Sequence, residues 1–141
     1  MVQLSDYNTF FEYRIQWGQM DAAQHINNLE YLRWAESARV EYFDKIGISV
    51  DFGTSDLAPI LGWQECKYIF PITYPDIALV GIKTTEIMSD RLMLETSVFS
   101  KKYERIACVS KQSIVPYDYI KLTKVSLPGE WVERIKNYEK W

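Results

Sequence analysis

Residues 17–39 read WGQMDAAQHINNLEYLRWAESAR, and this stretch decides how the rest of the chain is interpreted. From Asn27 or Asn28 to Ile46 the chain contains neither Pro nor Gly. Apolar side chains recur there at the spacing of one helical face: Tyr31, Leu32, Ala35, Ala38, Tyr42, Phe43 and Ile46. An Asn side chain is suited to cap the first backbone N–H groups, and Gly47 is a typical helix stop. We therefore predict a helix that begins at Asn27 or Asn28 and ends at Ile46.

The segments on both sides of this helix are predicted to be mainly strands. Residues 10–17 (FFEYRIQW) combine aromatic and β-branched side chains with partial alternation, which indicates a first strand. Residues 48–56 contain Gly, Ser and Asp and are predicted to form a loop. Four more strands are predicted near residues 58–70, 76–88, 91–101 and 105–116. Because their connections are too short for parallel crossovers, we predict an antiparallel meander.

A short helix is predicted at the end of the chain. Pro128 precedes a segment in which Trp131, Ile135 and Tyr138 recur at helical spacing. The order of strand, long helix and four antiparallel strands is that of an α+β domain whose sheet wraps one mainly apolar helix.

The composition is that of one globular domain spanning residues 1–141. Hydrophobic residues make up 48% of the chain and charged residues 25%, which is the balance of a folding rather than a disordered sequence. With a formal net charge of −3 there is no broad cationic surface for nucleic-acid phosphates. No apolar run approaches the roughly 18 residues of a membrane span, and no basic segment followed by an apolar one opens the chain. We therefore predict a cytoplasmic protein with no nucleic-acid partner and no membrane span.

The cysteines and the histidine restrict the metal and redox chemistry of the chain. Cys66 and Cys108 are the only cysteines and His25 is the only histidine, so neither a disulfide framework nor a Cys/His zinc site is predicted. A single disulfide between Cys66 and Cys108 stays open. The sequence has no glycine-rich phosphate loop, no Gly-x-Ser-x-Gly motif and no metal-binding cluster, so phosphoryl transfer, serine hydrolysis and metallohydrolysis are not predicted. We expect no metal and no cofactor.

The segment before the long helix carries the residues with chemical potential. The first N–H groups of a helix lack intrahelical partners and lie at the positive end of its dipole, so they can stabilise an oxyanion. Asp21 lies a few residues upstream, where its carboxylate can attack a carbonyl or deprotonate water, and His25 follows four residues later. The structural alternative for Asp21 is a helix cap or turn residue, and for His25 a hydrogen-bonded structural residue. Glu36 and Arg39 are three residues apart, and a pair on one helix face explains them.

The pattern Trp-x-x-Met-Asp-x-x-x-His-Ile-Asn-Asn-x-x-Tyr-Leu, continued by Glu36, Ala38 and Arg39, resembles the signature of hot-dog-fold acyl-CoA thioesterases. The resemblance is to the 4-hydroxybenzoyl-CoA thioesterase-like family and, more distantly, to plant acyl-ACP thioesterases. It extends over the whole chain in element order and is sharp across residues 17–39. It implies a hot-dog fold, in which an antiparallel β-sheet wraps a long central α-helix, and a homodimer or homotetramer whose active sites use two subunits.

The same resemblance implies roles for individual residues. Asp21 matches the catalytic carboxylate, as nucleophile or general base, and His25 matches a residue that orients the catalytic groups or hydrogen-bonds near the substrate. The implied substrate-binding residues are those at the helix start, with backbone N–H groups as oxyanion donors: Ile26, Asn27 and Asn28. Tyr31 is a further candidate for shaping the acyl pocket, with Trp34, Trp63 and Tyr68, and core packing explains all four equally well.

Two positions depart from the family pattern. Gln24 replaces a Gly that many relatives have just before the His, and Ala23 replaces an Asn that is usual in the acyl-ACP enzymes. We therefore favour CoA over a carrier protein as the thiol. Its phosphates need cations, for which the densest candidates are Lys101, Lys102 and Arg105 near a predicted hairpin, although a solvated turn explains that cluster too.

The implied activity is hydrolysis of an acyl-CoA thioester to a free carboxylic acid and CoA. Hydratases of the same fold carry an Asp-x-Asn-Pro-x-His pattern, which this chain lacks. The alternative is a non-catalytic hot-dog module that binds acyl-CoA or serves as a structural subunit, because a fold does not guarantee an activity.

Overall fold

The predicted long helix is present as α1 (Asn28–Ile46) in the computed structural model, which describes residues 2–50 and 56–141. Asn27 is its N-cap, since its side-chain Oδ1 accepts a hydrogen bond from the Leu29 N–H at 3.0 Å. Gly47 ends the helix with φ 89°, a left-handed conformation that favours glycine. Both ends of α1 are therefore encoded by local sequence signals.

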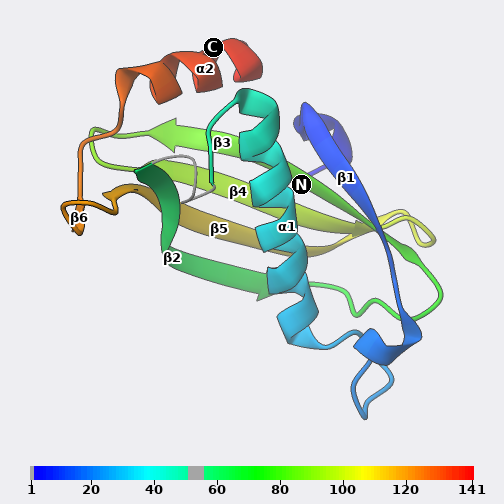
Figure 1. The fold of residues 1–141 in the computed structure, drawn as a ribbon. Coiled ribbons are helices and arrows are strands. Elements are labelled where there is room, and N and C mark those ends of the chain that lie inside the picture. Colours follow the sequence, from blue (N-terminus) through cyan, green and yellow to red (C-terminus); the bar gives the residue numbers. More distant parts are fainter. Residues whose placement is uncertain (1, 51–55) are drawn as a thin grey trace.

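A curved antiparallel sheet wraps α1 in the order β1-β3-β4-β5-β2, with β6 paired to β5 (Figure 1). The strands are β1 (Thr9–Arg14), β2 (Leu57–Tyr68), β3 (Ile77–Ile87), β4 (Leu92–Ser100), β5 (Arg105–Asp118) and β6 (Thr123–Lys124). A second helix, α2 (Gly129–Glu139), lies beyond one end of α1, and two short 3₁₀ helices, η1 (Leu4–Asp6) and η2 (Trp17–Gln19), flank β1. The α+β hot-dog arrangement is confirmed.

The predicted meander is wrong for β2. Strands β3, β4 and β5 are consecutive neighbours, but β2 pairs with β5 at the far edge, and β1 occupies the place beside β3. The eight-residue connection 69–76 can reach roughly 26 Å at 3.3 Å per residue, which is more than three strand spacings of about 4.8 Å. A short connection excludes a parallel neighbour, but it does not force an antiparallel one.

Other boundaries differ locally from the predictions. The first strand ends at Arg14, because residues 17–19 form the turn of η2. Strand β6 and helix η1 were not predicted, whereas the terminal helix is confirmed with Pro128 as its N-cap. Of the predicted loop 48–56, residues 51–55 lie outside the described part of the chain.

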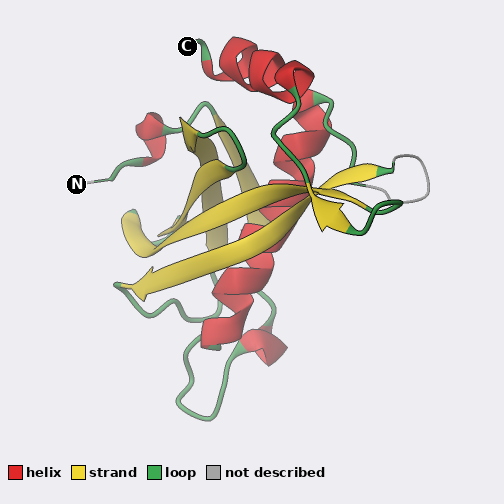
Figure 2. Cartoon of the chain, turned by 90° about the vertical axis from the view of Figure 1, so that its left-hand side faces the viewer, coloured by secondary structure: helices red, strands yellow, loops and turns green. Residues whose placement is uncertain are grey.

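The core lies between α1 and the concave face of the sheet (Figure 2). Helix residues such as Ala38, Tyr42 and Phe43 are buried against strand residues such as Ile82 and Leu94. At the C-terminal half of α1, the Tyr42 hydroxyl is 2.8 Å from Thr84 Oγ1 and accepts the Thr84 N–H at 3.2 Å. This polar contact satisfies two buried groups and fixes the helix against β3.

Candidate active site

Asp21 opens a tight turn that projects beyond the N-terminus of α1. Met20 and Ile26 form an antiparallel bridge, and the Asp21 N–H donates to the His25 carbonyl at 2.9 Å. The Gln24 N–H donates to the Asp21 carbonyl at 3.0 Å, and the Asp21 carboxylate accepts the Ala23 N–H at 2.9 Å. Such a side-chain bond to the backbone two residues on is a common way for Asp to stabilise a turn. One carboxylate oxygen thus holds the turn while the side chain stays exposed.

Gln24, which departs from the family pattern, has a backbone conformation that favours Gly. Its φ is 65°, a left-handed conformation, in the loop that the Asp21 and Gln24 N–H groups close. For a residue with a Cβ this conformation costs about 1–2 kcal/mol, whereas Gly adopts it freely. The departure therefore places local strain at the turn that carries Asp21.

Replacing Gln24 by Gly should raise the free energy of unfolding by about 0.5–1 kcal/mol, since relief of left-handed strain outweighs the larger chain entropy of Gly. Gln24→Val should lower it, because a β-branched side chain tolerates this region worst. Urea denaturation of the two variants and the wild type checks the ranking. Equal midpoints for all three would contradict the assigned conformation.

Asp21 and His25 are brought together through their backbones. The two residues face each other across the hairpin and both are exposed in the single chain. Within the described residues the His25 ring has no hydrogen-bond partner. The arrangement leaves the His25 ring and the second Asp21 carboxylate oxygen free to meet a substrate or a second subunit.

The N–H groups at the start of α1 are not equally available. Ile26 donates to the Ile72 carbonyl at 2.9 Å, and Asn27 donates to the Gln19 carbonyl at 2.9 Å. The Leu29 N–H is capped by the Asn27 side chain. In the part of the chain that the structure describes, the Asn28 N–H alone among these has no acceptor. Of the three donors implied by the resemblance, Asn28 is therefore the one that is free to bind an oxyanion.

Tyr31 occupies a structural position just inside the helix. It is 4% exposed, and its hydroxyl accepts the Ile72 N–H at 3.2 Å. Its ring makes edge contacts with Trp34 and Tyr68, each at 5.4 Å between ring centroids. Tyr31 and Trp34 are therefore packed in the core, which is the structural alternative given for them above. Trp63, on β2, is far more exposed.

Tyr68 joins strand β2 to the helix start. Its hydroxyl donates to the Asn28 carbonyl at 3.0 Å, and the side chain is 46% exposed. The sequence offered Tyr68 only as one of several aromatic residues. The contact depends on how the end of β2 meets α1, for which no local signal exists.

The cationic cluster of the β4–β5 turn is engaged in local contacts. Lys101 lies 3.5 Å from Glu12, Lys102 stacks on Tyr103, and Arg105 lies 4.2 Å from the centroid of the Phe70 ring. These contacts fit the solvated-turn alternative and leave the charges at the surface.

Glu36 and Arg39 make no ion pair in the described part of the chain. Burial lowers the pKa of Arg39, and the charge of Glu36 opposes that shift. The predicted pair is therefore a longer-range interaction rather than a direct contact.

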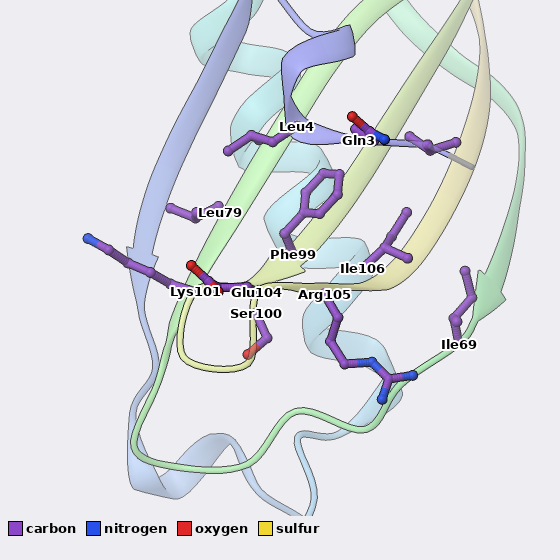
Figure 3. A pocket seen from close by; sticks show the side chains of 11 residues that line it. Gln3, Leu4, Ile69, Leu79, Phe99, Ser100, Lys101, Glu104, Arg105 and Ile106 are labelled. Carbon is purple, nitrogen blue, oxygen red and sulfur yellow. The ribbon is translucent and has the colours of Figure 1, made fainter.

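A pocket of about 720 Å³ lies away from this site, on the face of the sheet opposite to α1 (Figure 3). Phe99 and Ile106 rise there from the sheet toward the N-terminal segment, beside Leu4 and Leu79. Its lining combines aliphatic side chains and Phe99 with charged ones, Lys101, Glu104 and Arg105, and includes neither Asp21 nor His25. The position of these two residues, rather than the size of this pocket, therefore defines the candidate active site.

Two further properties of the described residues bear on the chemistry. No group of three or more His, Cys, Asp or Glu side chains is arranged to hold a metal ion in residues 2–50 and 56–141. Over the same residues, no helix has the length and apolar character needed to cross a membrane.

The model of one protein family, the thioesterase-like superfamily, matches residues 15–135. No curated protein matches the chain in sequence. Among solved structures, a DHNA-CoA thioesterase from Staphylococcus aureus is similar with a TM-score of 0.82 at 18% identity, covering 94% of this chain and 91% of its own. A 1,4-dihydroxy-2-naphthoyl-CoA thioesterase from Synechocystis reaches 0.79 at 16% identity, with 89% and 93% covered. A Staphylococcus aureus protein solved in complex with CoA reaches 0.84 at 12% identity, with 93% and 83% covered. At these identities the structures show a shared fold.

Proposed function

The chain belongs to the thioesterase-like superfamily, and from that premise we propose that it hydrolyses an acyl-CoA thioester to a carboxylic acid and free CoA. The observation that carries the proposal is the exposed carboxylate of Asp21 on a turn that is hydrogen-bonded to the start of α1. Thioester hydrolysis needs a group that attacks or activates water and a donor for the carbonyl oxygen. Both kinds of group are present there.

Asp21 is proposed to act in one of two ways. As a nucleophile, it attacks the thioester carbonyl, CoA leaves as a thiolate that takes up a proton, and water cleaves the acyl anhydride. As a general base, it removes a proton from water while the water attacks the same carbonyl. In both cases negative charge develops on the carbonyl oxygen.

The Asn28 N–H is proposed to stabilise that oxygen. It is the first helical residue, so the α1 dipole adds to its hydrogen bond. Asn27 supports this donor indirectly, because its side chain caps Leu29 and fixes the first turn. His25 is proposed to orient the thioester or the attacking water from the other arm of the hairpin.

CoA is the proposed thiol carrier. A structural neighbour was solved in complex with CoA, and others are named as CoA thioesterases. One neighbour is named as a 1,4-dihydroxy-2-naphthoyl-CoA thioesterase, so aromatic acyl-CoAs are first in the substrate panel.

The competing function is a module that binds acyl-CoA without turnover. Loss of the ultraviolet absorbance of the thioester, followed over a panel of short, long and aromatic acyl-CoAs, distinguishes the two. We expect turnover of at least one member. Calorimetric binding of an acyl-CoA by folded protein that cleaves none of the panel would favour the binding module.

We also propose that the chain forms a homo-oligomer through the open edge of β2. From Ala58 to Tyr68 this strand pairs only with β5 among the described strands, which leaves a long row of backbone groups open on its other edge. Leu61 and Trp63 lie exposed along it. A second copy paired at this edge would cover these groups and bring another subunit toward the exposed Asp21 and His25.

Replacing Trp63 by Lys should weaken the dimer by about 2 kcal/mol or more, because large aromatic side chains at the centre of an interface carry much of its binding energy. Sedimentation over a concentration series measures the change in the dissociation constant. Trp141→Lys is the matched control, since Trp141 is 57% exposed beyond α2 and away from β2. A wild type that sediments as a monomer at every concentration would contradict the proposed interface.

A further inference from the structure

The two cysteines lie on neighbouring strands and face each other. Cys66 on β2 is opposite Ser110 and Cys108 on β5 is opposite Tyr68, so the two cysteines are diagonal neighbours on one face of the sheet. Their Sγ atoms are 2.9 Å apart, and both residues are free thiols. Cys108 is buried in the core beneath α1, whereas Cys66 is half-buried.

The two thiols are chemically unequal. A hydrogen bond from the Cys108 thiol lowers the pKa of Cys66, against the opposing effect of burial. The interaction with Cys66 and burial raise the pKa of Cys108. Cys66 is also the more accessible of the two to a peroxide, and since the thiolate is the nucleophilic form, Cys66 is the attacking sulfur and Cys108 the resolving one.

The pair is connected to the start of α1. The Tyr68 hydroxyl donates to the Asn28 carbonyl at 3.0 Å, and the Tyr68 ring packs on Tyr31 in the first turns of α1. Only Lys67 separates Cys66 from Tyr68 on β2. A movement of β2 at Cys66 is therefore transmitted through Tyr68 to Asn28.

We propose that Cys66 and Cys108 form a reversible dithiol–disulfide switch that changes the start of α1 when a hydroperoxide oxidises it. The Cys66 thiolate attacks a peroxide oxygen, the O–O bond breaks, and Cys66 becomes a sulfenic acid while hydroxide (or the alkoxide of an organic peroxide) leaves and is protonated. The Cys108 sulfur then attacks Cys66 Sγ, the S–S bond forms, the S–O bond breaks, and the departing hydroxide takes the Cys108 proton as water. The pair loses two electrons, which reduce the peroxide.

Bond formation has a mechanical consequence at this position. The sulfurs must approach from 2.9 Å to the roughly 2.05 Å of a disulfide. Diagonal positions of an antiparallel pair are about 7–8 Å apart at Cα, which is wider than most disulfides span. Closing the bond therefore draws β2 toward β5 and shifts Tyr68 away from its contact with Asn28.

The test begins with hydrogen peroxide treatment of the full chain, followed by intact mass measurement without reductant. We expect loss of the mass of two hydrogens, recovered on addition of dithiothreitol, and one peptide that links Cys66 to Cys108. Cys108→Ser should stop at a sulfenic acid on Cys66 that a dimedone probe captures, whereas Cys66→Ser should give neither product. The switch would be overturned if the wild type formed no disulfide between Cys66 and Cys108, or if dimedone labelled the Cys66→Ser variant and not the Cys108→Ser variant.

Hydrogen exchange then measures whether the bridge reaches α1. Losing one hydrogen bond at the helix start should speed exchange in the first turns of α1 about fivefold in the oxidised protein. Tyr68→Phe is the matched control, because it should still form the bridge but show no further change at α1 on oxidation. Identical exchange in reduced and oxidised wild type would refute the coupling.

Any effect of the switch on hydrolysis rests on the proposed function, whereas the bridge and the exchange response do not. Given that function, oxidation should lower thioester cleavage about five- to tenfold by displacing the Asn28 donor. A bridge that changes exchange at α1 in a protein without thioesterase activity would uphold the switch and refute the proposed function.

Discussion

Replacing Asp21 by Asn should lower kcat/KM for acyl-CoA hydrolysis by about 10²–10⁴-fold, the range for loss of a positioned acid–base group. Asn keeps an oxygen that can accept the Ala23 N–H, so the turn should be retained. The side chain is exposed, so the free energy of unfolding should change by less than about 0.5 kcal/mol. Steady-state cleavage and urea denaturation of the same preparation separate these two effects.

Asp118→Asn is the matched control for this substitution. Asp118 also holds a turn, since its carboxylate accepts the Ile120 and Lys121 N–H groups at 2.9 Å each. That turn follows β5 and is remote from residues 20–28 in sequence. We expect wild-type kcat/KM in this variant. A similar loss in both variants would mean that turn stability, rather than the Asp21 carboxylate, limits the activity.

The two proposed roles of Asp21 differ in which carboxylate, that of Asp21 or that of the product acid, takes up the oxygen atom of the attacking water. In heavy-oxygen water with excess substrate, a nucleophilic Asp21 should acquire label in its own carboxylate over many turnovers when water opens the anhydride at the Asp21 carbonyl carbon, whereas a general base should not. Mass spectrometry of the peptide that contains Asp21 reads out the difference. Label in Asp21 assigns the nucleophilic mechanism, and both results are compatible with the proposed reaction.

Truncating Tyr42 to Ala should lower the free energy of unfolding by about 3–5 kcal/mol, as for other fully buried aromatic side chains. Tyr42 is 0% exposed, and its ring packs against Phe43 and Tyr138 in the middle of the helix–sheet layer. Urea denaturation at constant m-value measures the loss. A shift below about 1 kcal/mol would contradict the assigned packing of α1.

Tyr42→Phe separates packing from hydrogen bonding in the same position. The ring is kept, but the Thr84 N–H and hydroxyl lose the oxygen that pairs them. Leaving buried polar groups unpaired should cost about 1–3 kcal/mol. If the Phe and Ala variants lost the same free energy of unfolding, packing of the Tyr42 ring would make no contribution of its own, which would contradict the account.

The long helix and the family were predictable from residues that lie close together in sequence. The bounds of α1 follow from the Asn27 cap, the apolar spacing and Gly47, all of which act within a few residues. The position of β2 was not predictable, because its pairing with β5 joins residues such as Cys66 and Ser110 that are far apart in the chain. Register between distant strands depends on packing over the whole sheet rather than on local propensity.

The candidate site, too, was predictable only in part. The motif pointed to Asp21, His25 and the helix start, but it did not show which of the three backbone N–H groups at residues 26–28 is free to bind an oxyanion. The acceptors that occupy two of them are the carbonyls of Gln19 and Ile72, and backbone carbonyls carry no residue-specific signal. The sequence left a pairing of Cys66 with Cys108 open for a similar reason, since their proximity depends on the pairing of β2 with β5. A cytoplasmic location stays a prediction.

The measurement that tests the central claim most directly is single-turnover cleavage of the acyl-CoA panel by excess wild-type protein, beside Asp21→Asn of equal folded concentration. Loss of thioester absorbance reports the reaction without interference from Cys66 and Cys108. We expect at least one acyl-CoA to be cleaved by the wild type and to persist with the variant. Cleavage at equal rates by both proteins, or no cleavage of any panel member by folded wild type, would contradict the account.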